Sequence, residues 1–176
     1  MPAKDYPSVE YIRQCVRYED GHLFWLERPR GHFLDDRAWE SWNARFSGEE
    51  AGTKGARYWY VRINYKSIKR HLVVWALHHG VIDPGVDHEN RNSYEDRIEN
   101  LRKATQQQQV RNAGKRKDNT SGYKGVSWDK RSGYWAAYIM VDKRKIHLGY
   151  FDDLEEAHEA YVKASIRYFG EFACSG

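Results

Sequence analysis

Two adjacent residues, Asp87 and His88, carry side chains that together could act on a phosphate. A carboxylate is a hard oxygen ligand suited to Mg²⁺ or Mn²⁺. Imidazole, with an ordinary pKa of about 6.5, is a base that works at neutral pH. On a strand, adjacent side chains point to opposite faces, so a metal ligand and a base could flank one phosphate without quenching each other. Asp87 and His88 are therefore the candidate catalytic pair.

The residues after this pair predict a polar loop, a second strand and a short helix. The second strand is expected over residues 101–104, as the return of a hairpin. Thr105 and Gln108 then form a T-x-x-Q capping box, which marks a helix N-terminus. The helix is expected to run to about Ala113, with Gly114 as a possible stop.

This order resembles the ββα-metal core of HNH endonucleases, particularly the phage-type homing enzymes. The matching residues are Val86-Asp87-His88, Asn90, Asp96-Arg97-Ile98-Glu99-Asn100-Leu101-Arg102 and Thr105. The upstream segments HLVVWALHHGVI and RAWESWNARFSGEEAG are also similar to that family, so the likeness covers about residues 8–113. An Asp-His pair alone is a weak signal. The pair followed by Asn-Leu-Arg and a capped helix is a strong one.

The resemblance implies a role for each of three residues. His88 would be the general base that removes a proton from the attacking water. Asp87 would bind one divalent ion, Mg²⁺ or Mn²⁺, which contacts the scissile phosphate and stabilises the leaving 3′ oxygen. Asn100 would hydrogen-bond the loop backbone and so hold His88 in line.

One position departs from the family pattern. The second protein ligand of the metal is usually Asn or His, and Gln109 stands there in this chain. Gln offers the same amide oxygen on a longer side chain, whereas Mg²⁺ is geometrically strict. Asn112, on a neighbouring face of the helix, is the alternative ligand. Weakened metal affinity, a changed metal preference and an inactive site all stay open. His71 also matches a family position, where a hydrogen-bonded structural histidine is the favoured interpretation.

A second module follows the small, polar segment DNTSG at residues 118–122. Strands are expected over residues 123–128, 135–141 and 145–151, and a helix over 153–169 with one apolar face. This module resembles an AP2 DNA-binding domain over about residues 119–173. Its marks are Tyr123-Lys124-Gly125-Val126, Trp135-Ala136-Ala137, Leu148-Gly149-Tyr150-Phe151 and the Glu-Glu-Ala helix.

The alternation of side chains sorts the two faces of this sheet. Trp135, Ala137, Ile139, Ile146 and Leu148 should pack on the helix, which leaves the opposite face open. In AP2 domains the open face enters the major groove. Residues at or near the family's contact positions are Lys124, Ser127, Lys130, Arg131, Tyr138, Lys145 and His147. Several arginines of the family are replaced here, so the target sequence cannot be carried over.

A basic block precedes the second module. Between Arg102 and Lys117 the charged residues are all cationic: Arg102, Lys103, Arg111, Lys115, Arg116 and Lys117. All of these except Lys103 are candidate DNA-contacting residues. Such a block suits a phosphate backbone, although a solvated linker would have the same composition.

The remaining segments predict the supporting elements. A helix capped by Ser8 is expected over about residues 9–18, strands over 22–28 and 58–69, and a long loop over about 29–57. Asn64-Tyr65-Lys66 is a plausible hairpin turn within the second strand segment. A further helix is expected over 71–79 with Gly80 as its stop. Its residues Val74, Trp75 and Ala76 should be core, and no catalytic role is assigned to His78 or His79.

Together these patterns predict an α+β protein. A mixed α/β region leads into a ββα-metal core at about 85–113, and an AP2-type three-stranded antiparallel sheet with one helix follows. The predicted domains are residues 1–113 (nuclease), 114–121 (basic linker) and 122–176 (AP2-like). The chain has 176 residues, and 40% are hydrophobic, which suits compact cores.

The composition of the chain indicates in which compartment it works and which partners it binds. No apolar run reaches the length of a membrane span, and MPAKDYPSVEY lacks the apolar core of a signal peptide. Cys15 and Cys174 form no C-x-x-C motif, so no structural zinc is expected, and two unpaired thiols suit a reducing compartment. We therefore expect a cytoplasmic monomer, in the host cytoplasm if phage-encoded. Its partner would be double-stranded DNA, with no membrane and no small-molecule cofactor.

Three functions stay open on the sequence alone. The first is a metal-dependent DNA endonuclease whose AP2 sheet selects the site. The second is a sequence-specific DNA-binding regulator on a nuclease scaffold that Gln109 has impaired. The third is an RNA-binding or purely structural role, because interleaved aromatic and basic residues also occur in RNA binders.

Overall fold

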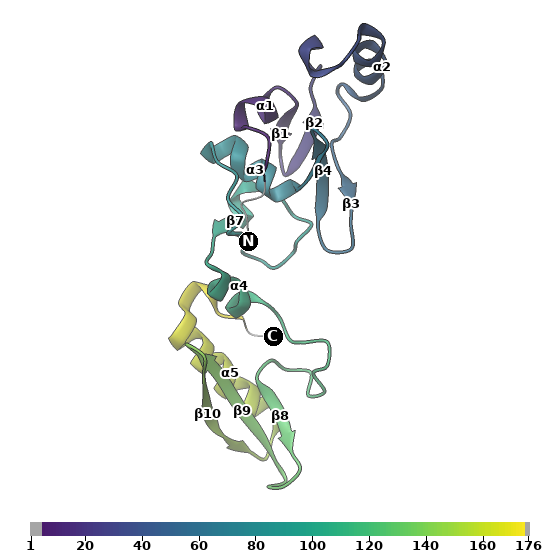
Figure 1. Ribbon diagram of the computed structural model, residues 1–176. Coiled ribbons are helices and arrows are strands. Elements are labelled where there is room, and N and C mark those ends of the chain that lie inside the picture. The colour runs from purple at the N-terminus through teal and green to yellow at the C-terminus, as the bar shows by residue number, and fades with distance from the viewer. Residues whose placement is uncertain (1–4, 175–176) are drawn as a thin grey trace. The chain divides into compact units, whose positions relative to one another are not determined.

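The computed structural model describes residues 5–174, which fold as an α+β protein of small antiparallel sheets and helices, as predicted (Figure 1). The chain divides into two compact units between Lys103 and Ala104. This division falls upstream of the predicted basic linker at 114–121, so the short helix α4 packs with the second unit. Residues 1–4 and 175–176, the ends of the two predicted domains, lie outside the described residues.

The first unit contains three sheets and three α-helices within the described residues. Its elements are α1 (Val9–Arg13), β1 (Val16–Glu19), β2 (His22–Trp25), η1 (Arg30–His32), α2 (Asp36–Phe46), β3 (Thr53–Lys54), β4 (Trp59–Ile63), β5 (Lys66–Lys69), α3 (Arg70–His79), β6 (Val86–His88), η2 (Ile98–Asn100) and β7 (Leu101–Lys103). Strands β1 and β2 form one hairpin, β3, β4 and β5 form a sheet in that order, and β6 pairs with β7.

Local signals explain several of these elements. Ser8 caps α1 by accepting from the backbone N–H of Tyr11 at 3.2 Å, as expected. Asn64 and Tyr65 both have positive φ, 47° and 59°, which is the type I′ geometry of a two-residue hairpin. Gly80 ends α3 in the left-handed conformation with φ 74°. The turn and the helix stop are therefore where the sequence predicted them.

Two predicted elements were wrong. The first helix ends at Arg13 rather than near residue 18, and Val16–Glu19 form strand β1 instead. Asp20 and Gly21, with φ of 47° and 89°, make the tight turn that pairs β1 with β2. An Asp-Gly pair is a strong hairpin signal that outweighs a weak helical periodicity.

The expected loop over residues 29–57 instead contains helix α2. Asp35 caps it by accepting from the backbone N–H of Ala38 at 2.7 Å. Trp42 packs with three other aromatic rings, at centroid distances of 5.2 Å to Trp25, 5.8 Å to Phe33 and 5.2 Å to Phe46. The tryptophans thus form an apolar stripe on a helix rather than isolated residues in a loop.

The core of the first unit lies between α3 and the surrounding strands. The predicted core residues Val74, Trp75 and Ala76 are buried. Other members of this core are Ile12, Cys15, Val16, Leu23, Ala51, Val61, Ile63, Ile68, Leu72, Val73, Val86 and Leu101. Because Val86 and Leu101 are part of this core, the β6–β7 hairpin that carries His88 is fixed against it.

The second unit is a three-stranded sheet covered on one face by a helix. Its elements are α4 (Gln106–Asn112), β8 (Val126–Asp129), β9 (Tyr134–Val141), β10 (Arg144–Phe151), α5 (Leu154–Phe169) and η3 (Gly170–Phe172). The strand order is β10-β9-β8, with antiparallel pairing throughout. Asp153 caps α5 with bonds from Glu155 and Glu156.

The predicted inner face of this sheet packs as expected. Ala137 and Ile139 are buried beside Ala157, Tyr161 and Ala164 of α5. Trp135, Ile146 and Leu148 are partly buried against the same cluster. The alternation of side chains therefore predicted the two faces of this sheet correctly. Cys15 is buried in the first unit and Cys174 in the second. Between residues 5 and 174, no helix has the length and apolar character to cross a bilayer.

Candidate functional site

The candidate catalytic pair lies on strand β6, opposite β7. Asp87 is paired in register with Arg102, and His88 with Leu101. Asp87 is half-buried, whereas His88 is buried with 3% exposure. The two side chains therefore project from opposite faces of the strand, as expected for neighbouring residues.

Asn100 ties the polar loop to the hairpin. Its side-chain oxygen accepts from the backbone N–H of Asn90 at 3.0 Å, and its amide nitrogen donates to the carbonyl of Glu95 at 2.8 Å. Its own backbone carbonyl accepts from Glu89 at 2.8 Å. One buried Asn side chain thus fixes two points of the loop that follows His88, which agrees with the role inferred from the resemblance.

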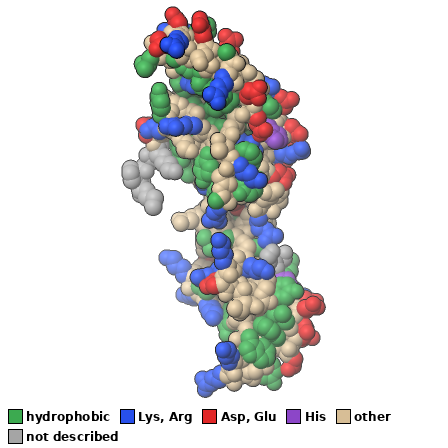
Figure 2. Space-filling view, turned by 90° about the vertical axis from the view of Figure 1, so that its right-hand side faces the viewer, with side chains coloured by type: hydrophobic (Ala, Val, Ile, Leu, Met, Phe, Trp, Pro, Cys, Tyr) green, Lys and Arg blue, Asp and Glu red, His purple; other side chains and the backbone are tan. Residues whose placement is uncertain are grey.

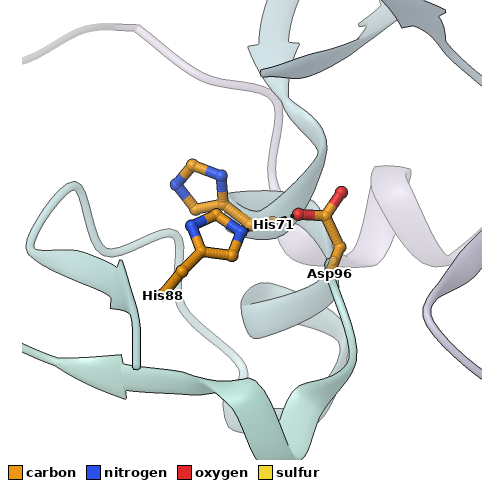
Figure 3. A group of neighbouring side chains, drawn as sticks. All are labelled: His71, His88 and Asp96. Carbon is orange, nitrogen blue, oxygen red and sulfur yellow. Dashed lines mark hydrogen bonds and ion pairs between the residues drawn. The ribbon is translucent and has the colours of Figure 1, made fainter. Parts of the chain in front are cut away.

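A buried carboxylate holds the ring of His88. Asp96 Oδ1 lies 2.9 Å from His88 Nε2 (Figure 3). Asp96 Oδ2 accepts from Arg70 Nε at 2.7 Å. The side chains of Arg70 and Asp96 are only 2% and 1% exposed. Arg70 also donates to Glu50 at 2.9 Å. A charge that is buried this completely needs such a partner.

His71, on helix α3, packs against the His88 ring. The two ring centroids are 4.7 Å apart with an interplanar angle of 72°. Burial, the nearby His88 and Lys69 lower the pKa of His71 to about 3, against the opposing effect of Asp96. His71 is therefore neutral at physiological pH.

His71, His88 and Asp96 have ligand atoms within 4.8 Å of one another, so the group is compatible with a divalent ion. The Asp96 carboxylate already bonds Arg70 and His88, however, and an ion there would have to displace these contacts. The sequence prediction uses a different donor set, a carboxylate and an amide oxygen. Hard oxygen donors of that kind suit Mg²⁺ or Mn²⁺.

The other predicted metal ligands lie on α4, which belongs to the second unit. Thr105 and Gln108 form the predicted capping box. Gln109 is half-buried, and its amide nitrogen donates to the Ala104 carbonyl at a long 3.5 Å. Asn112 is 5% exposed. The pairing of Asp87 with Gln109 or Asn112 stays a prediction.

An exposed aromatic and basic face covers the sheet of the second unit. Tyr138 pairs with His147, and Met140 with Lys145. The Lys145 ammonium lies 3.6 Å from the centroid of the Tyr138 ring, and the His147 ring is 5.1 Å from the same centroid. We call Tyr138, Lys145, His147 and Tyr150 the open face; the His147 and Tyr150 rings are 4.6 Å apart.

Some of the remaining predicted DNA-contacting residues are exposed to solvent, whereas others bond to groups within the protein. Lys117, Ser127, Lys130 and Arg131 are exposed. Other basic groups bond within the protein: Arg111 to Asp142, Lys115 to the Gly122 carbonyl, Arg116 to Asp118, and Lys124 to the carbonyls of Arg111 and Ala113. Arg102 is half-buried on β7. Within the second unit, Figure 2 shows Lys and Arg side chains along one margin and Asp and Glu along the opposite margin.

Comparison with known proteins decides the family. Residues 69–111 match the HNH endonuclease family, and residues 121–171 match the AP2 domain. Protein 3.8 of Escherichia phage T7 is 32% identical over 111 residues, which are 62% of this chain and 91% of the phage protein. The chain belongs to the HNH endonuclease family. Like the order inferred from the sequence, its nuclease domain precedes its AP2 domain.

The AP2 domain of the chain has relatives among plant proteins. An AP2/ERF and B3 domain-containing transcription factor of Arabidopsis thaliana is 45% identical over 49 residues, which are 28% of this chain and 14% of that protein. APETALA2-like protein 2 of Oryza sativa subsp. indica is 33% identical over 54 residues, 31% of this chain and 12% of that protein. The chain spans only a small part of both plant proteins. No solved structure matches the chain significantly.

The sequence alone gave no role to Asp96 or Arg70. Asp96 is one of several acids in the polar loop, beside Glu89, Glu95 and Glu99, and nothing in their spacing separates it from the others. Arg70 precedes the predicted helix and has the appearance of a solvated residue. Only the fold shows that these two side chains meet in the interior next to His88.

Proposed function

We propose that this chain is a homing-type, metal-dependent endonuclease that hydrolyses a phosphodiester of duplex DNA. The observation that carries the proposal is the arrangement of the β6–β7 hairpin. There His88 is held in place by a buried carboxylate while Asn100 fixes the loop that follows. A general base must be held in one orientation to act on one water, and this hairpin does so.

Two of the chain's own residues, His88 and Asn100, have roles in the proposed hydrolysis. His88 accepts a proton from a water molecule as the water oxygen forms a bond to phosphorus. The bond between phosphorus and the 3′ oxygen breaks, which leaves a 5′ phosphate and a 3′ hydroxyl after that oxygen is protonated. Asn100 keeps the loop closed, so the His88 ring does not have to be ordered during the reaction.

The oxygens of Asp87 and Gln109, with Asn112 as the alternative to Gln109, are the donors proposed for one Mg²⁺ or Mn²⁺. The ion, when bound, would supply Lewis-acid stabilisation of the charge on the leaving oxygen. Asp87 is half-buried on strand β6.

Site selection is assigned to the second unit. The open face combines a cation, an imidazole and phenol rings on a sheet, and a sheet fits the major groove. The exposed Lys117, Lys130 and Arg131 would contact the phosphate backbone, which carries no sequence information. Lys124, Ser127, Arg102, Arg111, Lys115 and Arg116 complete the proposed contact set. The enzyme would act in the cytoplasm of a host cell, as a monomer.

The proposal is tested by cleavage of a DNA that the protein is known to bind. A random duplex library is first selected for binding in the presence of EDTA, and the recovered site is cloned into a plasmid. The native chain should cut this plasmid with Mg²⁺ or Mn²⁺, and His88→Ala should lower the rate by at least 100-fold. His79→Ala is the matched control, because the contacts of His79 with the Trp75 carbonyl and ring lie within its own helix. Undiminished cutting by His88→Ala would remove the assigned base.

A second candidate function is favoured by Gln109. Its amide nitrogen donates to the Ala104 carbonyl, and its side chain is one methylene longer than that of Asn. The chain would then bind a specific DNA site without cutting it, as a regulator. Tight binding with no cleavage in any divalent metal supports this alternative, and cleavage gained by Gln109→Asn would show that the longer side chain is the cause.

A further inference from the structure

A row of charges leads from the exposed Glu50 through two buried groups to His88. Glu50 accepts from Arg70 at 2.9 Å, and Arg70 donates to Asp96 at 2.7 Å. Asp96 in turn lies 2.9 Å from His88. Arg70 also stacks on Trp59, with its guanidinium carbon 4.5 Å from the ring centroid. The arginine is thus fixed on two sides, and it presents a permanent positive charge to the Asp96 carboxylate.

The chemistry of this contact determines which ring nitrogen carries the proton. A carboxylate that is paired with a guanidinium is ionised and can only accept hydrogen bonds. The atom of His88 that faces it, Nε2, must therefore be the donor. In a neutral imidazole only one nitrogen carries a hydrogen, so the lone pair of His88 lies on Nδ1.

We infer that Asp96 is a positioning residue for catalysis by His88: it holds the ring as the Nε2–H tautomer and makes Nδ1 the atom that accepts the proton from water. This inference rests on the proposed function. It adds the atom that reacts and the residue that selects it. After the proton transfer both nitrogens carry hydrogens, and the same carboxylate then stabilises the positive ring.

Packing supports the hydrogen bond. The edge of the neutral His71 ring meets the His88 ring at 4.7 Å, and Tyr58 lies on another side with its centroid 6.3 Å from that of His88. The His88 ring is 3% exposed, so it cannot flip to exchange its two nitrogens without moving these neighbours. Figure 3 shows the His71 ring beside that of His88 and the Asp96 carboxylate directed toward them.

The tautomer can be measured on the native protein without any cleavage assay. Long-range ¹H–¹⁵N NMR spectra of the ¹⁵N-histidine-labelled full chain at pH 7.5 distinguish the two ring nitrogens. The signal that disappears in His88→Ala identifies His88. The expected result is a protonated Nε2 and an unprotonated Nδ1. A protonated Nδ1, or an averaged pair of signals, would overturn the inference.

Asp96→Asn tests the consequence for the reaction. An amide can either accept from Nε2 or donate to it, so it no longer selects the tautomer. The cleavage rate at saturating DNA should fall by 10- to 100-fold, with the DNA dissociation constant unchanged within about twofold. Asp20→Asn is the matched control, since Asp20 is an exposed partner of Arg97 in the same unit. It should keep both the rate and the His88 tautomer.

A double variant separates positioning from a general loss of structure. If Asp96 acts through His88, Asp96→Asn should lower the rate of the native chain but not the residual rate of His88→Ala. An equal loss in both backgrounds would show a structural role and would overturn the inference. The native chain could have the Nε2–H tautomer and yet cut its bound site in no divalent metal. In that case the proposed function fails, but the conclusion that Asp96 keeps the ring proton on Nε2 of His88 stands.

Discussion

The Arg70 guanidinium donates to the Asp96 carboxylate at 2.7 Å, and both side chains are almost completely buried. Burying two charges is costly, and it is tolerated only because each satisfies the other. The pair joins the start of helix α3 to the loop between β6 and β7. It therefore links the core of the first unit to the hairpin that carries His88.

Removal of Arg70 should destabilise the first unit strongly. Arg70→Met leaves the Asp96 carboxylate buried without its cation, which should cost about 3–5 kcal/mol of unfolding free energy. Arg97→Met is the matched control, because the Arg97–Asp20 pair is exposed and should cost less than about 1 kcal/mol. Urea unfolding monitored by tryptophan fluorescence measures both. Equal effects would contradict the account of the buried pair.

His71 should make the first unit sensitive to acid. The pKa of His71 is about 3 in the folded protein, below its ordinary value near 6.5. Between pH 6.5 and pH 3, His71 is therefore protonated in the unfolded chain but not in the folded protein. Stability is unaffected above about pH 6.5 and falls by up to about 1.4 kcal/mol per pH unit as the pH drops toward 3. Urea unfolding at pH 7.5, 6 and 5 should show the loss.

The variant His71→Phe serves as the comparison for this prediction. It keeps a ring beside His88 and Tyr58 but removes the titrating group. The difference in stability between pH 7.5 and pH 5 should shrink relative to the native chain. An unchanged pH dependence would mean that other groups cause the acid sensitivity.

Asn100→Ala should weaken cleavage more than binding. The change removes the partner of the backbone groups of Asn90 and Glu95, at a cost of about 0.5–1.5 kcal/mol for each hydrogen bond, because both bonds are only partly buried. The loop then no longer fixes His88, and the cleavage rate should fall at least tenfold while the DNA dissociation constant changes little. Asn92→Ala, in the exposed part of the same loop, is the control and should cut at nearly the native rate.

Much of the local structure is predictable from the sequence, and the exceptions have physical reasons. The Thr105 capping box and the Gly80 helix stop follow from a few adjacent residues. The Asp20-Gly21 turn and the Trp stripe of α2 were also present in the sequence but were outweighed by a helical pattern and by polar composition. Such signals are local, so a single sequence contains them.

The environment of His88 is different, because its partner Asp96 is itself held by a residue that is distant in the chain. Asp96 and Arg70 are separated by 26 residues. No spacing rule connects the first residue of a helix to an acid in a polar loop. The pairing depends on how α3 packs against the β6–β7 hairpin, which is a property of the whole first unit. The sequence therefore indicated His88 and Asn100 as site residues but not the Asp96 carboxylate that contacts His88.

The open face of the second unit should govern DNA affinity. Lys145→Ala should weaken DNA binding. It should also make the plot of the logarithm of the DNA-binding constant against the logarithm of the salt concentration less steep by about one, since one cationic contact with the DNA is lost. Tyr138→Ala should weaken binding as well, because Lys145 and His147 both pack on its ring. Lys163→Ala, which removes the same charge from the exposed side of α5, should leave affinity within about twofold. Fluorescence anisotropy at several salt concentrations measures all three.

Gly125 should be essential to the second unit. A Cβ atom there would lie 2.3 Å from the Tyr161 ring and 2.5 Å from the Tyr138 carbonyl, at a positive φ of 73°. Gly125→Ala should therefore destabilise this unit and abolish site-specific binding, which circular dichroism melts and anisotropy would show. Gly133→Ala has a similar φ of 75° but open space around it, so its effect should be limited to backbone strain of about 1 kcal/mol. Equal effects would contradict the close packing of α5 on the sheet.

His88 is the proposed general base for metal-dependent cleavage of duplex DNA. The most direct measurement compares the native chain with His88→Ala on a plasmid that carries the selected binding site, in Mg²⁺ and in Mn²⁺. The native chain should cut the plasmid at that site in Mg²⁺ or Mn²⁺ and should not cut it in EDTA. His88→Ala should cut at least 100-fold more slowly while binding the site with unchanged affinity. Cleavage by His88→Ala at the native rate would contradict this role of His88.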